Sequence, residues 1–183
     1  MQFSPADGHF GRLVERIVAG RPVVVLCAPP GFHKGRLAHA AAQRIAGGDG
    51  IAVFGLWEHG RDPRAAAEGL LAGQAPVTVI EEAGAADSRL LAQVLDRIDL
   101  EGAGRRVIFT IHQPGDLPLA RMALRARIDV LDADALRLRP QDIADTLKAS
   151  LRPAIRPRIQ ALAGDWPVAL DVLTRWAAAA RDV

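Results

Sequence analysis

The chain has 183 residues, of which 50% are hydrophobic and 24% are charged, and this is about one globular domain with a core of its own. The single cysteine, Cys27, excludes an intramolecular disulfide and suits a reducing compartment, and the net charge of +2 gives no argument for nucleic-acid binding. No apolar run approaches the ~20 residues of a membrane span and no targeting segment is visible, so we expect a cytoplasmic protein without membrane contact.

Hydrophobic periodicity predicts strands and helices that alternate along most of the chain. We expect strands at residues 23–27, 51–56, 77–80, 107–111 and 128–131, and helices at 10–18, 37–45, 62–73, 88–98 and 119–125. Strands separated by helices imply right-handed crossovers, and therefore a three-layer α/β fold with a parallel sheet and helices on both faces.

The character of the sequence changes at Arg139. Three helical stretches follow, at residues 141–151, 156–163 and 167–181, with no strand pattern between them. We therefore expect two parts: an α/β core at residues 1–138 and a helical subdomain at residues 139–183 that packs on it.

The segment VVVLCAPPGFHKGRL, residues 23–37, has the layout of a phosphate-binding loop. A buried strand runs into a Gly/Pro turn and then into a helix, with Lys34 at the start of the helix. In such a loop the backbone N–H groups and the helix N-terminus surround the phosphates, and the lysine neutralises their charge. The candidate phosphate-binding residues are Gly31, His33, Lys34, Gly35 and Arg36.

The same segment departs from the pattern G-x-x-x-x-G-K-[ST] at three positions. Ala28 and His33 stand where the two glycines belong, and Gly35 stands where a hydroxyl would bind Mg²⁺. If residue 33 needs a positive φ, histidine can adopt it only at some energetic cost. A weakened nucleotide site and a plain strand-to-helix turn both remain open.

Five segments taken together resemble one family. They are APPGFHKGRLA, GLWEHGRDP, VTVIEEAG, the stretch from VIFTIHQPGDLPLA to RPQDIADTL, and GDWPVALDVL. In this order they are similar to the N-terminal nucleotide-binding domain of MalT/LuxR-type large ATP-binding transcription regulators, which belong to the STAND class of P-loop NTPases. The resemblance implies a phosphate-loop strand between the fourth and fifth strands. It also implies a domain that uses ATP or ADP as a switch for self-assembly, with DNA bound by a separate C-terminal module.

The resemblance adds four candidate site residues, each of which also has an ordinary explanation. Glu81 and Glu82 match the acids that hold Mg²⁺ and orient water, or they are solvated acids at a strand end. His112 stands at the sensor position of the family, where an arginine is usual, or is simply polar. Pro167 matches a proline that packs on adenine. Local chemistry instead explains Asp165 as a helix N-cap, Trp166 as a core residue and Pro167 as a first-turn proline.

Three functions remain open at this point. The first is a degenerate STAND-type regulatory domain that binds adenine nucleotide weakly or not at all, hydrolyses none at a useful rate, and acts through a protein partner or self-association. The second is a working ATP switch or ATPase that uses Lys34, Glu81 and Glu82. The third is a pure interaction scaffold. Mg²⁺ binding is in question in the first case, and neither a metal-ligand spacing of histidines nor a nucleophile motif supports other chemistry.

Overall fold

The computed structural model describes residues 8–47, 50–55, 75–85, 105–124 and 128–180. The strands are β1 (Val23–Cys27), β2 (Ile51–Gly55), β3 (Val77–Glu81), β4 (Arg106–Ile111) and β5 (Ile128–Leu131). Each expected strand is therefore present, with ends that differ from expectation by one residue at most.

The five strands form one parallel sheet in the order β2-β3-β4-β1-β5. The first residue of β1, Val23, pairs with Val107 of β4 on one side and with Ile128 of β5 on the other. The position of β1 between the fourth and fifth strands is confirmed. A strand paired on both edges and covered on both faces is fully buried, which explains why β1 is a continuous apolar run.

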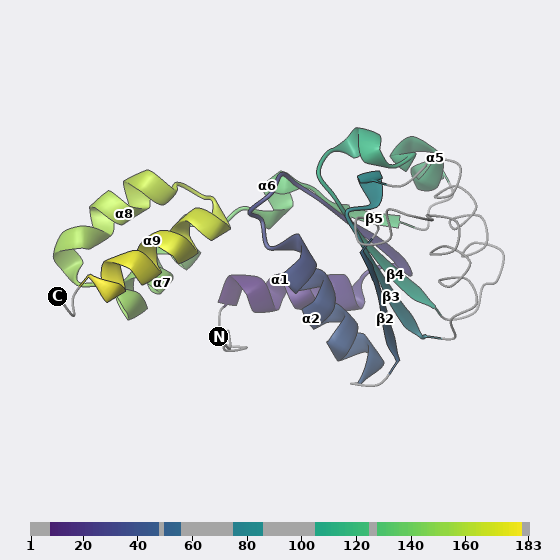
Figure 1. The fold of residues 1–183 in the computed structure, drawn as a ribbon, viewed down its shortest axis with the longest axis horizontal. Helices are drawn as coiled ribbons and strands as arrows, with labels where there is room; N and C mark the ends of the chain where they lie inside the picture. The colour runs from purple at the N-terminus through teal and green to yellow at the C-terminus, as the bar shows by residue number, and fades with distance from the viewer. Residues whose placement is uncertain (1–7, 48–49, 56–74, 86–104, 125–127, 181–183) are drawn as a thin grey trace.

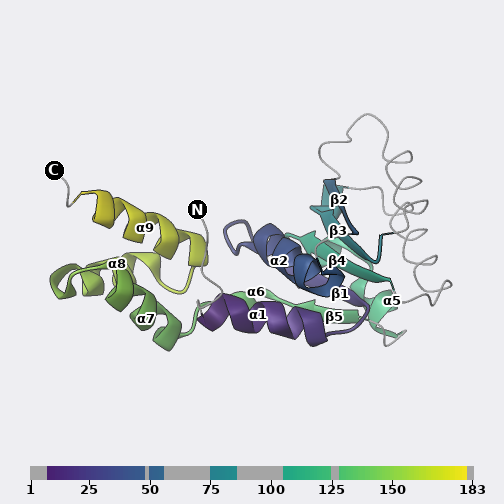
Figure 2. The same ribbon diagram turned by 90° about the horizontal axis from the view of Figure 1, so that it is seen from below.

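Helices cover the sheet on both faces (Figures 1 and 2). Alternate side chains of β1 point to opposite faces of the sheet. Val24 and Leu26 pack with α1 (Gly8–Ala19) and α2 (Lys34–Ala46) on one face. Val25 and Cys27 pack with α5 (Leu119–Leu124) on the other. The short helix α6 (Ala133–Leu136) follows β5 and was not predicted. The helices expected at 62–73 and 88–98 lie outside the described residues.

The C-terminal helices build an apolar cluster of their own, separate from the clusters on the two faces of the sheet. They are α7 (Pro140–Ser150), α8 (Arg156–Ala163) and α9 (Pro167–Ala179), and each has a proline in its first turn, where a missing N–H removes no helical hydrogen bond. The shared cluster consists of Ile143, Leu147, Leu151, Ile159, Ala163, Leu170 and Ala177. The three helices lie at one end of the molecule, and the sheet lies at the other (Figure 2).

One carboxylate ties these helices to the core. Asp142 of α7 accepts a hydrogen bond from Arg12 of α1 at 2.6 Å and one from Arg139 at 3.0 Å. The His9 ring, also on α1, lies 3.4 Å from the same carboxylate. The two guanidinium groups hold the pKa of Asp142 below its usual value even though burial acts in the opposite direction.

Among the described helices none is long and apolar enough to cross a membrane.

Arg106, at the start of β4, closes the C-terminal end of α1. Its guanidinium donates to the carbonyls of Ile17 at 3.0 Å, of Gly20 at 2.7 Å and of Arg21 at 3.1 Å, and also to that of Val18. The last carbonyls of a helix have no partner inside the helix, and a planar, five-donor cation satisfies several of them at once. This side chain therefore joins α1 to the sheet.

Replacing Arg106 by alanine should lower the free energy of unfolding by about 2–3 kcal/mol, because partly buried carbonyls lose charge-assisted hydrogen bonds. Urea denaturation measures the change. Arg44→Ala is the matched control, since Arg44 makes an exposed ion pair with Glu15 and should cost less than about 1 kcal/mol. Equal losses in the two variants would contradict the role given to Arg106.

Candidate functional site

The turn between β1 and α2 holds two residues in left-handed backbone conformations. Gly31 has φ +93 and His33 has φ 54 and ψ 27. His33 is also the N-cap of α2 and makes no side-chain cap hydrogen bond. The positive φ at residue 33 explains why the loop pattern has glycine there, because a side chain in this conformation is strained by about 1–2 kcal/mol. The turn therefore adopts at residue 33 the backbone conformation that favours glycine, although a histidine stands there.

Lys34 turns its ammonium group back onto the loop. Its Nζ donates to the carbonyls of Ala28 at 2.6 Å and Pro29 at 3.0 Å, and the side chain is buried. Burial lowers the pKa of the Lys34 ammonium, and the Glu82 carboxylate opposes that shift. Among the described residues no carboxylate lies in ion-pair contact with this buried ammonium, so an anion at this place would be stabilised.

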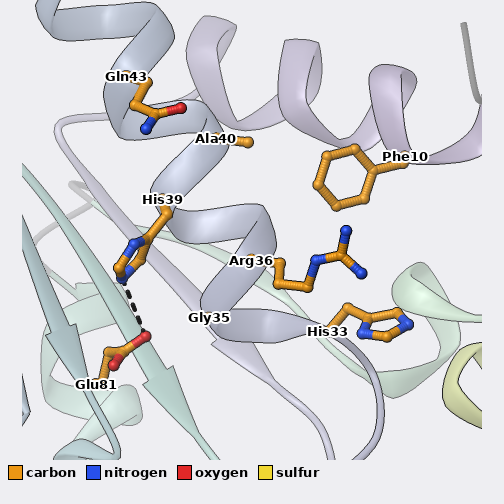
Figure 3. A pocket seen from close by; sticks show the side chains of 8 residues that line it. All are labelled: Phe10, His33, Gly35, Arg36, His39, Ala40, Gln43 and Glu81. Carbon is orange, nitrogen blue, oxygen red and sulfur yellow. Dashed lines mark ion pairs between the residues drawn. The ribbon is translucent and has the colours of Figure 1, made fainter. Parts of the chain in front are cut away.

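Glu81 lies beside Gly35. A Cβ added at residue 35 would lie 2.6 Å from Oε1 of Glu81, so this carboxylate fills the space next to the position that a Mg²⁺-binding hydroxyl would take. The same Oε1 is 3.2 Å from Nε2 of His39 on α2 (Figure 3). That nitrogen has no aligned hydrogen-bond partner among the described residues. The Glu81 carboxylate therefore lies close to α2 without an aligned hydrogen bond to the His39 ring.

Glu82 and His112 lie near the Lys34 ammonium group. Nε2 of His112 lies 3.4 Å from Oε1 of Glu82, and its Nδ1 lies 3.5 Å from Nζ of Lys34. Glu82 has φ 50, and its backbone N–H donates to Oγ1 of Thr110 at 3.0 Å. Lysine, imidazole and carboxylate thus form a row of polar groups across the ends of α2, β4 and β3.

Seven of the nine predicted site residues line one hollow of about 300 Å³: Gly31, His33, Lys34, Gly35, Glu81, Glu82 and His112. Pro30, Thr110 and Val168 line it too and were missed. Thr110 could have been suspected as a polar residue in an otherwise apolar strand. Val168 follows the predicted Pro167, but no local pattern indicates that it reaches this hollow.

Arg36 lies outside this hollow, on the side of α2 away from Glu81. Its guanidinium carbon is 6.0 Å from the centre of the Phe10 ring, a cation–π contact with α1. Both residues line a second hollow of about 590 Å³ along the outer face of α2, together with His33, Gly35, His39, Ala40, Gln43 and Glu81 (Figure 3). The two hollows meet at His33, Gly35 and Glu81, around the first turn of α2.

The expectations for Asp165 and Trp166 are wrong. Trp166 is 46% exposed and is itself the N-cap of α9, so it is not a core residue. The carboxylate of Asp165 accepts a hydrogen bond from Arg137 at 2.8 Å instead of capping the helix. The expectation used only the sequence pattern of a helix start. In the structure, Asp165 contacts Arg137 and Trp166 contacts Gly31, and both partners are distant in the sequence.

The fold is similar to those of solved DNA-processing proteins. The Thermotoga maritima RuvB Holliday junction branch migration motor has a TM-score of 0.63 and 18% identity, over 93% of this chain and 60% of that one. AMPPCP-bound DnaA from Aquifex aeolicus has a TM-score of 0.60 and 12% identity, over 96% of this chain and 62% of that one. No protein-family model and no curated protein matches the sequence. The likeness establishes a P-loop NTPase-like fold, and the chain spans about three fifths of the length of those two proteins.

Replacing His33 by glycine should leave the free energy of unfolding unchanged or raise it by up to about 1 kcal/mol, because glycine adopts the positive φ without strain. The control is His39→Gly, which makes the same change inside α2 and should lower stability by about 0.5–1 kcal/mol. Chemical denaturation compares the two variants. A loss at residue 33 as large as that at residue 39 would contradict the strain.

The stability of the protein should fall as the pH is lowered through 6.5, in part because of His33. Burial is the largest cause of its lowered pKa, Arg36 and Arg175 add to the shift, and Asp171 opposes it. With the folded pKa below the unfolded value of 6.5, the unfolded state takes up the proton first, so this contribution is complete above 6.5 and is lost between 6.5 and the folded pKa.

Replacing His33 by asparagine, which tolerates a positive φ, should reduce that pH dependence by at most about 1.4 kcal/mol per pH unit. Urea titrations at a series of pH values measure the slope. His9, whose pKa is also lowered, mainly by burial, should account for part of what remains. An unchanged slope in His33→Asn would show that this imidazole does not contribute.

Proposed function

We propose that this chain is a degenerate STAND-type P-loop domain of a LuxR/MalT-like transcription regulator. It binds adenine nucleotide weakly through the phosphate chain, hydrolyses none at a useful rate, and acts through contacts with a protein partner or with itself. One observation carries the proposal: the phosphate-binding half of the site, around Lys34, is retained, whereas the place of the Mg²⁺ hydroxyl has only Gly35 with Glu81 beside it.

The retained half supports anion binding. The 13-residue helix α2 begins at Lys34, and the first N–H groups of a helix have no intrahelical acceptor and carry partial positive charge. The Lys34 ammonium lies within 3.0 Å of the loop carbonyls, under the same turn. The similar DnaA structure contains AMPPCP, and this supports an adenine nucleotide as the ligand here.

The other half disfavours metal-assisted hydrolysis. Among the described residues that line the hollow, Glu81 and Glu82 are the carboxylates that could hold a hydrated Mg²⁺ ion, and they lie 3.2 Å from the His39 ring and 3.4 Å from the His112 ring, respectively. When it is bound in P-loop enzymes, this ion bridges the β- and γ-phosphates and neutralises the charge that develops during transfer. With no hydroxyl at residue 35, the site offers one ligand fewer, and each remaining acid lies beside a histidine ring.

The residue at the sensor position also differs. Arginine presents a fork of five donors with a permanent charge, whereas the imidazole of His112 has two nitrogens and faces both Lys34 and Glu82. The contact of His112 with a γ-phosphate would therefore be weaker than that of an arginine at the same position. We infer that ADP and ATP bind with similar affinity, so that any switch depends on occupancy rather than on hydrolysis.

Protein contacts are supported by the surface of the helical subdomain. Four large apolar side chains of α8 and α9 and of the turn between them are exposed: Leu162 by 64%, Trp166 by 46%, Val172 by 50% and Trp176 by 68%. Exposed aromatic residues are common in protein interfaces. The net charge of +2 offers no comparable argument for nucleic acid.

A working ATP switch is the second candidate. It is favoured by the convergence of Lys34, Glu81 and Glu82 on one hollow. A pure scaffold is the alternative if no nucleotide binds. The three functions differ in whether nucleotide binding occurs and whether it needs Mg²⁺.

Thermal unfolding with millimolar ADP or ATP, with and without Mg²⁺, should separate them. A ligand at ten times its dissociation constant adds about 1.4 kcal/mol, or a rise of about 3–6 °C for a chain of this size. We expect a rise of a few degrees at most, equal with and without Mg²⁺ and lost in Lys34→Ala. Lys148→Ala, a change of the only other lysine, exposed on α7, is the control and should retain the rise.

The proposal would be contradicted by a rise in unfolding temperature that depends strongly on Mg²⁺ and is accompanied by phosphate release. That outcome would favour the working switch. No shift in the wild type, together with no nucleotide in a denatured extract of the purified protein, would favour the scaffold.

A further inference from the structure

The N-terminus of α9 rests on the phosphate loop. The backbone N–H of Val168, in the first turn of α9, donates to the carbonyl of Gly31 at 3.1 Å. First-turn amides of a helix lack intrahelical acceptors, and the N-cap residue Trp166 makes no side-chain cap hydrogen bond. The loop carbonyl therefore takes the place of a capping group for α9.

The indole of Trp166 lies against the same glycine. A Cβ added at residue 31 would be 2.7 Å from Cε2 and 2.8 Å from Cζ2 of that ring, and closer still to Nε1. Only glycine fits between the loop and the indole, and its φ of +93 requires glycine as well. Trp166 thus has one side on the loop and the other, 46% of its surface, in solvent.

These two contacts fix the orientation of a peptide group in the loop. The peptide that joins Gly31 to Phe32 is planar and trans, so its N–H points opposite to its carbonyl. Because the Gly31 carbonyl is held toward α9, the Phe32 N–H is directed away from α9. Phosphate loops bind through such N–H groups, and a peptide that could rotate freely would lose this donor for part of the time.

We propose that Trp166 and the Val168 amide are positioning groups for the phosphate loop. They hold the Gly31–Phe32 peptide in the orientation that an anion needs, so docking of the helical subdomain raises the affinity of the loop. By linkage, a phosphate chain in the loop favours docking by the same factor. The inference rests on the proposed nucleotide binding, and it names the element through which occupancy reaches the helical subdomain.

The helical subdomain has other attachments, which make the contact testable. Asp142 joins α7 to Arg12 of α1, and Arg137, ahead of α7, binds Asp165. Removing the half-exposed indole leaves these in place. Trp166→Ala should therefore loosen the loop without unfolding the protein or releasing α7.

The experiment measures amide hydrogen exchange and ADP binding in matched variants. In Trp166→Ala, the amide of Val168 should exchange about tenfold faster, as expected when its hydrogen bond to the Gly31 carbonyl is weakened. A fluorescent ADP analogue should bind about tenfold more weakly. Trp166→Phe should restore most of both, and Trp176→Ala, the same change at a 68% exposed site of the same helix, should alter neither.

The outcomes separate the two claims. Unchanged exchange of the Val168 amide in Trp166→Ala would overturn the positioning role whether or not ADP binds, and so would exchange that rises equally in α7, because it would report general destabilisation. Faster exchange of the Val168 amide in a protein that binds no ADP even as the wild type would support the positioning of the loop and would overturn the proposed nucleotide binding instead.

Discussion

The site depends on the pairing of β1 with a strand on each of its edges. Parallel pairing with β4 and β5 aligns the carboxyl ends of the strands, and the crevice at this edge of an α/β sheet is where ligands bind. This alignment brings Lys34, which follows β1, close to His112, which follows β4. His112 in turn lies close to Glu82, which follows β3, although the three residues are far apart in the sequence. A buried, doubly paired strand also gives the following turn a rigid base, so that the strained backbone at His33 can persist.

At this edge of the sheet, the site combines a buried lysine that suits a phosphate with two carboxylates that lie beside histidines, and it lacks a hydroxyl at residue 35. The Lys34 ammonium is buried against neutral carbonyls, an arrangement that an anion would improve. Glu81 beside Gly35 and Glu82 beside His112 instead present two carboxylates that are already paired with imidazoles. This division is the basis of the proposal that the domain binds a phosphate chain without efficient hydrolysis.

The sequence predicted those features that depend on local patterns or on the order of the strands. The apolar run 23–27 and the parallel sheet follow from periodicity, whereas the central position of that strand and the candidates Glu81, Glu82 and His112 were implied by the family resemblance. The contact of Trp166 with Gly31 could not be predicted in this way, since it depends on how α9 packs on the core. Likewise, the approach of Glu81 to Gly35 is a matter of side-chain direction at a strand end, and the strand pattern alone would allow the carboxylate to point into solvent.

The central claim is that the loop still binds a phosphate chain without a metal, and amide NMR tests it most directly. In the presence of a chelator, pyrophosphate should shift the backbone amide signals of Phe32, His33, Lys34 and Gly35 together and saturably, because their N–H groups are the expected donors. Signals of α7, far from the loop, should not follow the same curve. If the loop amides show no saturable shift at millimolar pyrophosphate, the turn binds no phosphate chain and the account of this site is wrong.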